Sequence, residues 1–197
     1  MVFDRDYVIH GDAADVVIAV EEDALIRWDD VTAEAVTSMD PTRRLARLSP
    51  GSTTVIGTDP GLADTAAILL AAEQIGAAAR CLELTVDYTK ERVQFGRPIG
   101  SFQALKHRMA DLYVAVQSAR AVVGEAIARP GPTAAALARL AASEAFSKVA
   151  GEAVQLHGGI AITWEHDIQL YFKRAHGSAQ LLGPPRDQLR RLESEVF

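Results

Sequence analysis

Seven apolar residues in the second half of the chain follow one another at alternating spacings of three and four positions. They are Phe102, Leu105, Met109, Leu112, Val116, Ala119 and Val123. This spacing puts side chains on one stripe of an α-helix. An apolar stripe of this length must be covered by other helices, so the pattern predicts a helical bundle.

A run rich in Ala and Leu begins after residue 58 and favours helix. Asp59 is placed as an N-cap and Pro60 at the first helical position, so a long helix is predicted from there to about Arg92. Further helix starts are predicted where a capping residue or a proline precedes an apolar run: Ser101, Gly131-Pro132 and Thr163. The sequence thus predicts four main helices and a short terminal one.

Small residues line one seam of the first predicted helix: Ala72, Gly76 and Ala79. A seam without large side chains lets a neighbouring helix approach closely. We therefore expect this seam, like the longer apolar stripe, to pack against another helix. The same seam is a reason to expect an oligomer.

Residues 1–58 have a strand-like pattern of short apolar runs separated by turn residues. The runs cover residues 7–9, 16–20 and 24–28, with a further pair expected at 45–48 and 53–56. Residues 29–40 are acidic and poorly periodic, so no strand is assigned there. The predicted fold class is mainly α, with a helical bundle domain over residues 59–197 after a small antiparallel β part over residues 1–58.

Charge and hydropathy exclude two classes of partner. The chain has 20 Lys and Arg against 26 Asp and Glu, a net charge of -6, which argues against nucleic-acid binding. In the most apolar region the longest uncharged stretch, Thr65–Ala72, is far shorter than the roughly 20 residues of a membrane-spanning helix. Asp4, Asp6 and Asp12 interrupt the place of a signal-peptide core, so we expect a cytoplasmic protein.

Searches for metal sites and activated nucleophiles find no matching motif. None of the five histidines forms a pair with the cysteine at the spacing of metal ligands. These histidines are His10, His107, His157, His166 and His176. The sequence has neither a Gly-x-Ser-x-Gly elbow nor a phosphate loop, which argues against hydrolase and nucleotide triphosphatase chemistry. Cys81 is the only cysteine, so we expect it to be an unreactive packing residue.

Two segments combine glycine with polar and aromatic residues: residues 92–103 and 155–159. Arg92 can hold a phosphate through two parallel hydrogen bonds, Phe95 can cover a planar ring, and Gly158-Gly159 let the backbone approach a bulky ligand. Spacing alone also fits ordinary helix ends, with a basic last turn at Arg92 and a glycine stop at Gly158.

These segments resemble the C-terminal helical domain of the acyl-CoA dehydrogenase family. The resemblance covers about residues 60–185, and residues 1–58 resemble the later strands of that family's middle β-domain. The matching stretches are Tyr88–Gln103, Lys106–Asp111, Val154–Gly159, Thr163–Asp167 and Leu170–Ala175. The chain has no counterpart of the family's N-terminal helical domain or of its earlier β-strands.

The resemblance implies an FAD-dependent α,β-dehydrogenation, in which a carboxylate removes the α-proton of an acyl-CoA thioester and the flavin accepts the β-hydride. The family's flavin lies between subunits. By position Arg92 is similar to the arginine that holds the FAD pyrophosphate of a neighbouring subunit. The other implied cofactor contacts are Gln94, Phe95 and Gln103 in the first segment and Gln155, Gly158 and Gly159 in the second.

The resemblance also implies that the catalytic base is missing. The family's usual glutamate falls on Leu182, just before Gly183, and its alternative position falls on Ala66. The threonine that usually follows that glycine is replaced by Pro184, which has neither a hydroxyl nor an amide proton. Glu73 lies two helical turns beyond Ala66, about 10 Å along the axis, too far to replace the base for an unshifted substrate.

Three functions are therefore weighed. The leading one is a subunit or fragment of an FAD-dependent acyl-CoA dehydrogenase, inactive alone, in a homo- or hetero-oligomer with another such subunit that carries the base. Its resemblance to bacterial members that act on sterol side-chain or other bulky acyl-CoA thioesters suggests a substrate class. The second is a non-enzymatic oligomerisation module that has lost flavin. The third is an active homo-oligomer with Glu73 as a relocated base.

Overall fold

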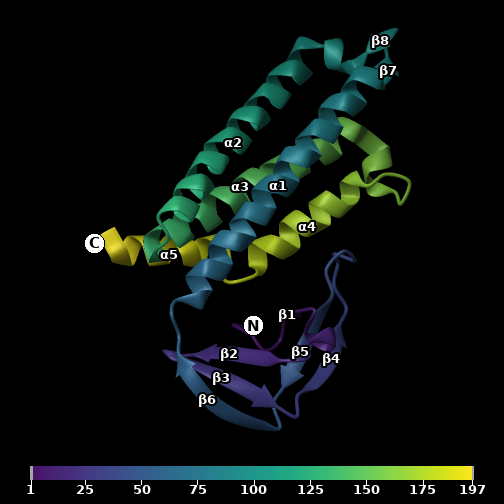
Figure 1. The fold of residues 1–197 in the computed structure, drawn as a ribbon. Helices are drawn as coiled ribbons and strands as arrows, with labels where there is room; N and C mark the ends of the chain where they lie inside the picture. Colours follow the sequence, from purple (N-terminus) through teal and green to yellow (C-terminus); the bar gives the residue numbers. More distant parts are fainter. Residues whose placement is uncertain (1, 197) are drawn as a thin grey trace. The chain divides into compact units, whose positions relative to one another are not determined.

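The computed structural model describes residues 2–196. By its contacts the chain divides into two compact units, residues 1–66 and 67–197. This division lies inside the first helix, whereas the sequence suggested a boundary between residues 58 and 59. The two units are described separately below (Figure 1).

The first unit contains two three-stranded antiparallel sheets, with strand orders β1-β5-β4 and β2-β3-β6. The strands are β1 Val8–Ile9, β2 Val17–Glu21, β3 Ala24–Asp29, β4 Thr32–Val36, β5 Leu45–Ser49 and β6 Ser52–Thr58, with a short 3-10 turn, η1, at Gly11–Ala13. Both sheets contribute to one apolar core around Trp28, which is 3% exposed, with Val17 from β2 and Leu48 from β5. The predicted small antiparallel β part is confirmed.

Strand β4 was missed because it has no buried face. None of its five residues is buried, and the strand is held by pairing with β5 from Thr32 opposite Ser49 to Val36 opposite Leu45. An alternation of apolar and polar residues indicates only strands that have one buried face. A strand that is stabilised by backbone pairing alone has no such alternation in its sequence.

The second unit is a helical bundle, as predicted. Its helices are α1 Leu62–Glu91, α2 Gln103–Ala128, α3 Pro132–His157, α4 Ile168–Gln180 and the short α5 Pro185–Val196. Between them lie the hairpin β7 Val93–Gln94 and β8 Arg97–Pro98, and the 3-10 turns η2 Ile99–Ser101 and η3 Gly158–Ile162.

Two of the expected helix starts need correction. The Asp59 carboxylate accepts hydrogen bonds from the backbone N–H groups of Gly61 and Leu62, at 3.2 and 3.0 Å, so it caps α1 although the helix begins after Pro60. The start predicted at Thr163 is wrong, because α4 begins at Ile168. The Thr163 hydroxyl instead donates to the Ile160 carbonyl at 2.9 Å and closes η3.

The seven-residue apolar stripe is confirmed as a core-facing side of α2. Leu112 and Val116 pack in one cluster with Phe146 of α3, and Ala119 and Val123 pack in a second cluster with α1 and α3. Both clusters draw residues from α1, α2 and α3, so these three helices pack against one another at two places.

The expected packing of the small-residue seam on α1 is wrong at its centre. Gly76 is exposed, and a Cβ built there would meet no atom within 4 Å. Only the flanking Ala72 and Ala79 border the core clusters. The missing side chain therefore does not serve helix packing inside this chain.

By length and composition alone α1 could cross a membrane. Eleven of its residues are nevertheless buried within the structure, and they include the polar Gln74, Thr85 and Thr89. The apolar character of α1 is therefore explained by its place in the bundle core.

Candidate functional site

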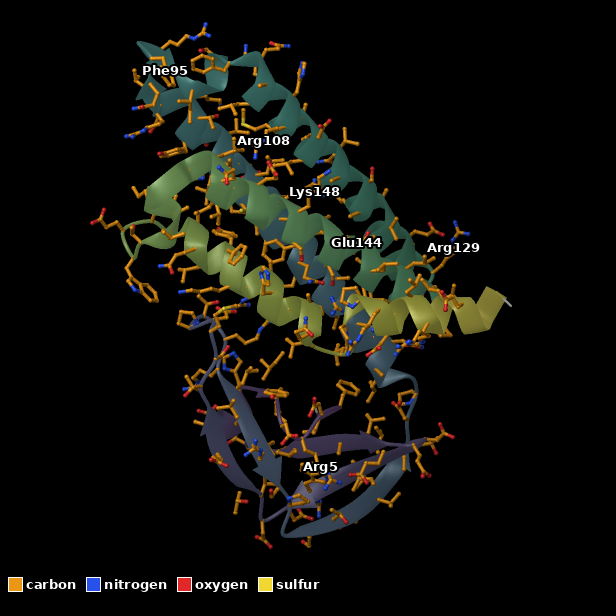
Figure 2. The ribbon with its side chains drawn as sticks, turned by 180° about the vertical axis from the view of Figure 1, so that it is seen from behind. Arg5, Phe95, Arg108, Arg129, Glu144 and Lys148 are labelled. Carbon is orange, nitrogen blue, oxygen red and sulfur yellow. The ribbon has the colours of Figure 1, made fainter. Side chains whose placement is uncertain are left out.

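The segment after α1 forms a tight hairpin that carries an aromatic side chain on its tip. The two-residue loop Phe95-Gly96 has positive φ at both residues, 55° and 75°, as a type I′ turn requires. Phe95 is 91% exposed, and Figure 2 shows it at the end of the bundle. A bulky residue held in the left-handed region and in water indicates a role outside this chain's own packing.

The guanidinium of Arg92 is available for an anion. Arg92 is exposed at the base of the hairpin, and its side chain has no partner within residues 2–196. Arg97, across the hairpin, packs over the ring of Phe102 at 4.0 Å. Phe102 also meets Phe95 edge to face at 6.1 Å, so it braces the hairpin from α2's side.

Two glutamines predicted for the same segment are exposed and locally bonded. The Gln94 amide donates to the neighbouring Val93 carbonyl at 2.8 Å. Gln103, the first residue of α2, lies 2.9 Å from the His107 ring through their Nε2 atoms. Both amides lie on the surface, where they can exchange these bonds for a ligand.

The second predicted segment lies at the end of α3. Gln155 is exposed, and its side chain has no partner among the described residues. Gly158 has φ 67° and ψ -147°, a conformation that essentially only glycine adopts, and neither it nor Gly159 has an atom within 4 Å of a built Cβ. The backbone here is open to close approach by another molecule.

Tyr88 joins the two segments. It lies one turn before Arg92 on α1, and its hydroxyl donates to the His157 carbonyl, beside Gly158, at 3.2 Å. The rings of Tyr88 and His157 are stacked with centroids 4.2 Å apart. The structure therefore places the ends of α1 and α3, which carry the candidate residues, at the same end of the bundle.

The two positions that the resemblance equates with a catalytic base carry no acid. Leu182 follows α4, has φ 57°, and packs against the cluster that contains Ala67 and Ala71. Gly183 follows with φ 90°, and Pro184 precedes α5. Ala66 is the fifth residue of α1.

Side chains from two helices hold the turn around Leu182. Buried Arg139 of α3 donates to the carbonyls of Ser178 and Leu181 at 3.1 and 2.8 Å. The Gln188 amide of α5 donates to the Leu182 carbonyl at 2.9 Å. Glu73, the one acid considered as a displaced base, forms an ion pair of 3.0 Å with Arg174 of α4.

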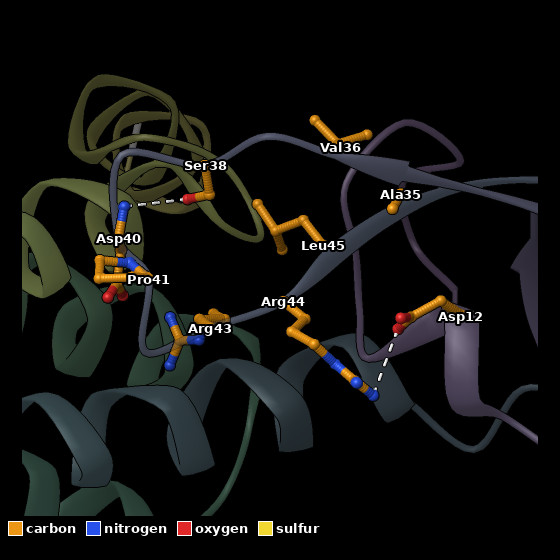
Figure 3. Close-up of a pocket in the computed structure, with 9 residues that line it drawn as sticks. All are labelled: Asp12, Ala35, Val36, Ser38, Asp40, Pro41, Arg43, Arg44 and Leu45. Atoms are coloured by element: carbon orange, nitrogen blue, oxygen red, sulfur yellow. Dashed lines mark hydrogen bonds and ion pairs between the residues drawn. The ribbon is translucent and has the colours of Figure 1, made fainter.

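Two cavities in the described part of the chain, residues 2–196, lie away from these residues. A cavity of about 190 Å³ lies beside the β4–β5 loop, where Arg44 forms an ion pair of 3.6 Å with Asp12 (Figure 3). A shallow groove of about 290 Å³ runs between α2 and α3 beside Glu144 and Lys148 (Figure 2). Both are below the usual size of a ligand pocket, about 300 to 1,000 Å³, so the exposed end of the bundle remains the candidate site.

Comparison with known proteins decides the family. The family model described as acyl-CoA dehydrogenase, C-terminal domain, matches residues 62–193, from α1 to α5. The chain belongs to the acyl-CoA dehydrogenase family. It is 71% identical over its whole length to acyl-CoA dehydrogenase IpdE2 of Mycolicibacterium smegmatis, and it spans 63% of that relative.

Two solved structures of acyl-CoA dehydrogenases share the fold. The ChsE4–ChsE5 complex of Mycobacterium tuberculosis matches with a TM-score of 0.87 and 29% identity, over 96% of this chain and 57% of that one. A Tcur3481–Tcur3483 steroid acyl-CoA dehydrogenase variant matches with a TM-score of 0.82 and 30% identity, over 92% of this chain and 54% of that one. The chain therefore spans a little over half the length of these relatives' chains.

In this acyl-CoA dehydrogenase chain the two kinds of candidate residue lie at opposite ends of α1. Arg92 follows the last residue of α1, while Leu182 packs against a cluster whose α1 members, from Ala67 to Ile75, lie in the first half of the helix. The 25 positions between Ala67 and Arg92 correspond to about 38 Å of helix at 1.5 Å per residue. Arg92 is therefore far from Ala67 along the helix axis.

The sequence did not reveal the aromatic stacking and the side-chain hydrogen bonds that support these segments. Tyr88 and His157 lie inside the matched motifs but received no role, and Arg139 and Gln188 were not noticed. Residues that meet across 69 or 42 positions follow no helical period, so only the folded structure reveals these contacts. Cys81 is buried, which raises the pKa of its thiol to about 12 and agrees with the expected unreactive role.

Proposed function

We propose that this chain contributes the pyrophosphate and adenosine contacts of an FAD site in an assembled acyl-CoA dehydrogenase, and that another polypeptide supplies the catalytic base. The observation that carries the proposal is the exposed pair Arg92 and Phe95 on a braced hairpin, whereas Leu182 packs against a cluster whose last α1 member, Ile75, lies 17 positions, about 26 Å of helix, before Arg92. In this proposal a flavin that meets Arg92 of this chain places its reactive ring beside a different chain. An oligomer, homo- or heteromeric, is therefore part of the proposal.

The residues at the hairpin end fit the polar half of FAD. Arg92, whose side chain has no partner among the residues that the structure describes, offers parallel N–H groups to a pyrophosphate, and the open backbone at Gly158 and Gly159 admits a bulky nucleotide. Phe95 offers a ring face, while the Gln103 and Gln155 amides offer hydrogen bonds. When bound, FAD would supply the acceptor for the hydride lost by the acyl chain.

The three positions considered for a base do not provide one in this proposal. Leu182 and Ala66 cannot accept a proton, and Glu73 is held by Arg174 across the α1–α4 interface. General-base catalysis contributes about 10² to 10⁴-fold, so a chain without a base is a poor catalyst even with flavin bound. The heteromeric ChsE4–ChsE5 complex among the structural relatives supports a partner with a complementary site.

The substrate class we propose is an acyl-CoA thioester with a bulky acyl group. A structural relative whose name specifies a steroid acyl-CoA dehydrogenase supports this choice. In this arrangement the present chain orients the cofactor, and the partner contacts the acyl chain at the reacting carbons.

The test is the flavin content of the complex purified from its native source, with wild-type chain, Arg92→Ala or Arg129→Ala. Arg129 is a matched control, because it is an exposed arginine after a helix end and pairs only with Glu125 of its own helix turn. We expect Arg92→Ala to lose most of the visible flavin absorbance and Arg129→Ala to keep it.

Each of the other possible flavin contents argues against one of the three functions considered for this chain. Equal flavin in all three preparations would show that Arg92 is not a cofactor ligand, and no flavin in any of them would favour the oligomerisation module. A stoichiometric flavin band in the chain expressed alone would mean that it assembles a complete site with itself. In that case Glu73→Gln would decide whether Glu73 acts as the base.

A further inference from the structure

Three aromatic rings gather where α1, α3 and α4 meet. Tyr88 comes from α1, His157 is the last residue of α3, and His166 lies just before α4. His157 is stacked on Tyr88, and the rings of His157 and His166 are 4.6 Å apart at a tilt of 60°. His166 also meets Tyr88 edge to face at 6.0 Å. Residues 158–165, which include η3, are thus closed into a loop by the two histidines.

The hydrogen bonds assign a tautomer to each ring. Nδ1 of His157 lies 2.8 Å from the Ala153 carbonyl, which can only accept, so this nitrogen carries the proton. Its Nε2 then bears a lone pair, and that atom is buried without a partner. Nδ1 of His166 accepts the backbone N–H of Ile168 at 3.1 Å, so the His166 proton is on Nε2. Both rings are neutral in this arrangement.

Protonation of either ring conflicts with these contacts. A proton on His157 Nε2 would create a buried charge with no acceptor, because the side chain is only 4% exposed. A proton on His166 Nδ1 would displace the Ile168 N–H and remove the acceptor at the first residue of α4. Two charged rings 4.6 Å apart would also repel each other.

The charged neighbours do not cancel this effect at His157. Burial lowers the pKa of His157 below its ordinary value of 6.5, the Ala153 carbonyl opposes this, and His166 lowers it further. No carboxylate is among these causes, and the group that faces His157 from α1 is the neutral phenol of Tyr88. Glu165 and Asp167 flank His166 in the sequence and are exposed.

We propose that His157 and His166 form an acid-sensitive latch, which in its neutral form holds residues 158–167 between α3 and α4 and releases them on acidification. The direction of the pH effect on the stability of the closed form follows from the difference in proton binding between the closed and open forms. Because the folded pKa of His157 is depressed, the unfolded segment binds more protons below 6.5, and the closed form loses stability as pH falls through that range. Above pH 7 the His157 ring is neutral and the latch is closed. Under the proposed function, opening would also weaken flavin binding at Gly158 and Gly159.

The test is amide hydrogen exchange of residues 158–168 in the full, flavin-free chain from pH 8 to pH 5, corrected for intrinsic chemical rates. We expect the corrected opening constant of this segment to rise up to about tenfold per pH unit for each proton taken up. His157→Asn should abolish most of the rise, because the ring whose folded pKa is depressed is then absent. His166→Asn should reduce the rise, because an asparagine oxygen can accept the Ile168 N–H two residues on but removes the ring that lowers the His157 pKa further.

A matched control is His176→Asn. His176 also contacts a carbonyl four residues before it, that of Phe172 at 3.0 Å, but it is exposed on α4. Its variant should keep the wild-type pH response. A flat response in the wild-type chain, or an undiminished response in both His157→Asn and His166→Asn, would overturn the latch.

The wild-type chain provides a measurement that needs no variant. Side-chain nitrogen NMR should show the Nδ1-protonated tautomer of His157 at pH 8 and a midpoint of titration below 6.5. A His157 midpoint at or above 6.5 would also overturn the proposal. Because these measurements use no flavin, failure of the proposed cofactor role would leave them readable.

Discussion

The rings of Tyr88 and His157 are stacked 4.2 Å apart, and the Tyr88 hydroxyl donates to the His157 carbonyl at 3.2 Å. The two residues are 69 positions apart in the chain. Arg92 follows Tyr88 by one helical turn and Gly158 follows His157 directly. This one pair therefore sets the spacing between the hairpin and the glycine pair that we assign to the cofactor.

Replacing Tyr88 should separate its two contacts. Tyr88→Phe keeps the ring and removes the hydroxyl, so we expect a loss of about 1 kcal/mol in the free energy of unfolding. Tyr88→Leu also removes the stacked pair and should cost about 0.5 to 1.5 kcal/mol more. Urea unfolding of both variants checks the order, and a leucine variant as stable as the phenylalanine variant would show that stacking contributes nothing.

The Arg139 clamp should be worth far more than an exposed arginine. Arg139→Met leaves the carbonyls of Ser178 and Leu181 without these donors, and we expect a loss of about 3 kcal/mol or more in the free energy of unfolding. Arg120→Met on the exposed side of α2 should change it by less than about 0.5 kcal/mol. Equal effects in thermal or urea unfolding would mean that the clamp is not a stabilising contact.

The elements that could be predicted from the sequence are those in which buried residues recur at a regular spacing. The stripe from Phe102 to Val123 located α2 and its buried face because burial recurs with the helical period. Strand β4 and the exposed Gly76 were misjudged because neither backbone pairing nor an open surface leaves a periodic trace. The family motif located the hairpin, whereas the positive φ at Phe95 and the ring cluster at His157 depend on contacts between distant segments.

Phe95 and Phe146 should respond in opposite ways to truncation. Phe146 is fully buried between α1, α2 and α3, so Phe146→Ala should lower the free energy of unfolding by about 3 to 5 kcal/mol. Phe95→Asn should leave it unchanged or raise it by up to about 1 kcal/mol, because asparagine tolerates positive φ better. The same Phe95→Asn variant should lower the flavin content of the native complex. Unchanged flavin content would remove Phe95 from the proposed cofactor contacts.

Burial of Cys81 should slow alkylation of its thiol and should make the free energy of unfolding fall at alkaline pH. Its thiol is buried, with a pKa raised from 9.0 to about 12 by burial, so iodoacetamide should label it only after unfolding. Between pH 9 and 12 the unfolded chain loses this proton while the folded chain retains it. The folded state therefore binds more protons in that range, and stability falls as pH rises. Cys81→Ala should flatten this part of the stability curve relative to wild type, measured by urea unfolding from pH 8 to pH 10.5. An identical slope in both proteins would show that this thiol does not contribute to the alkaline loss of stability.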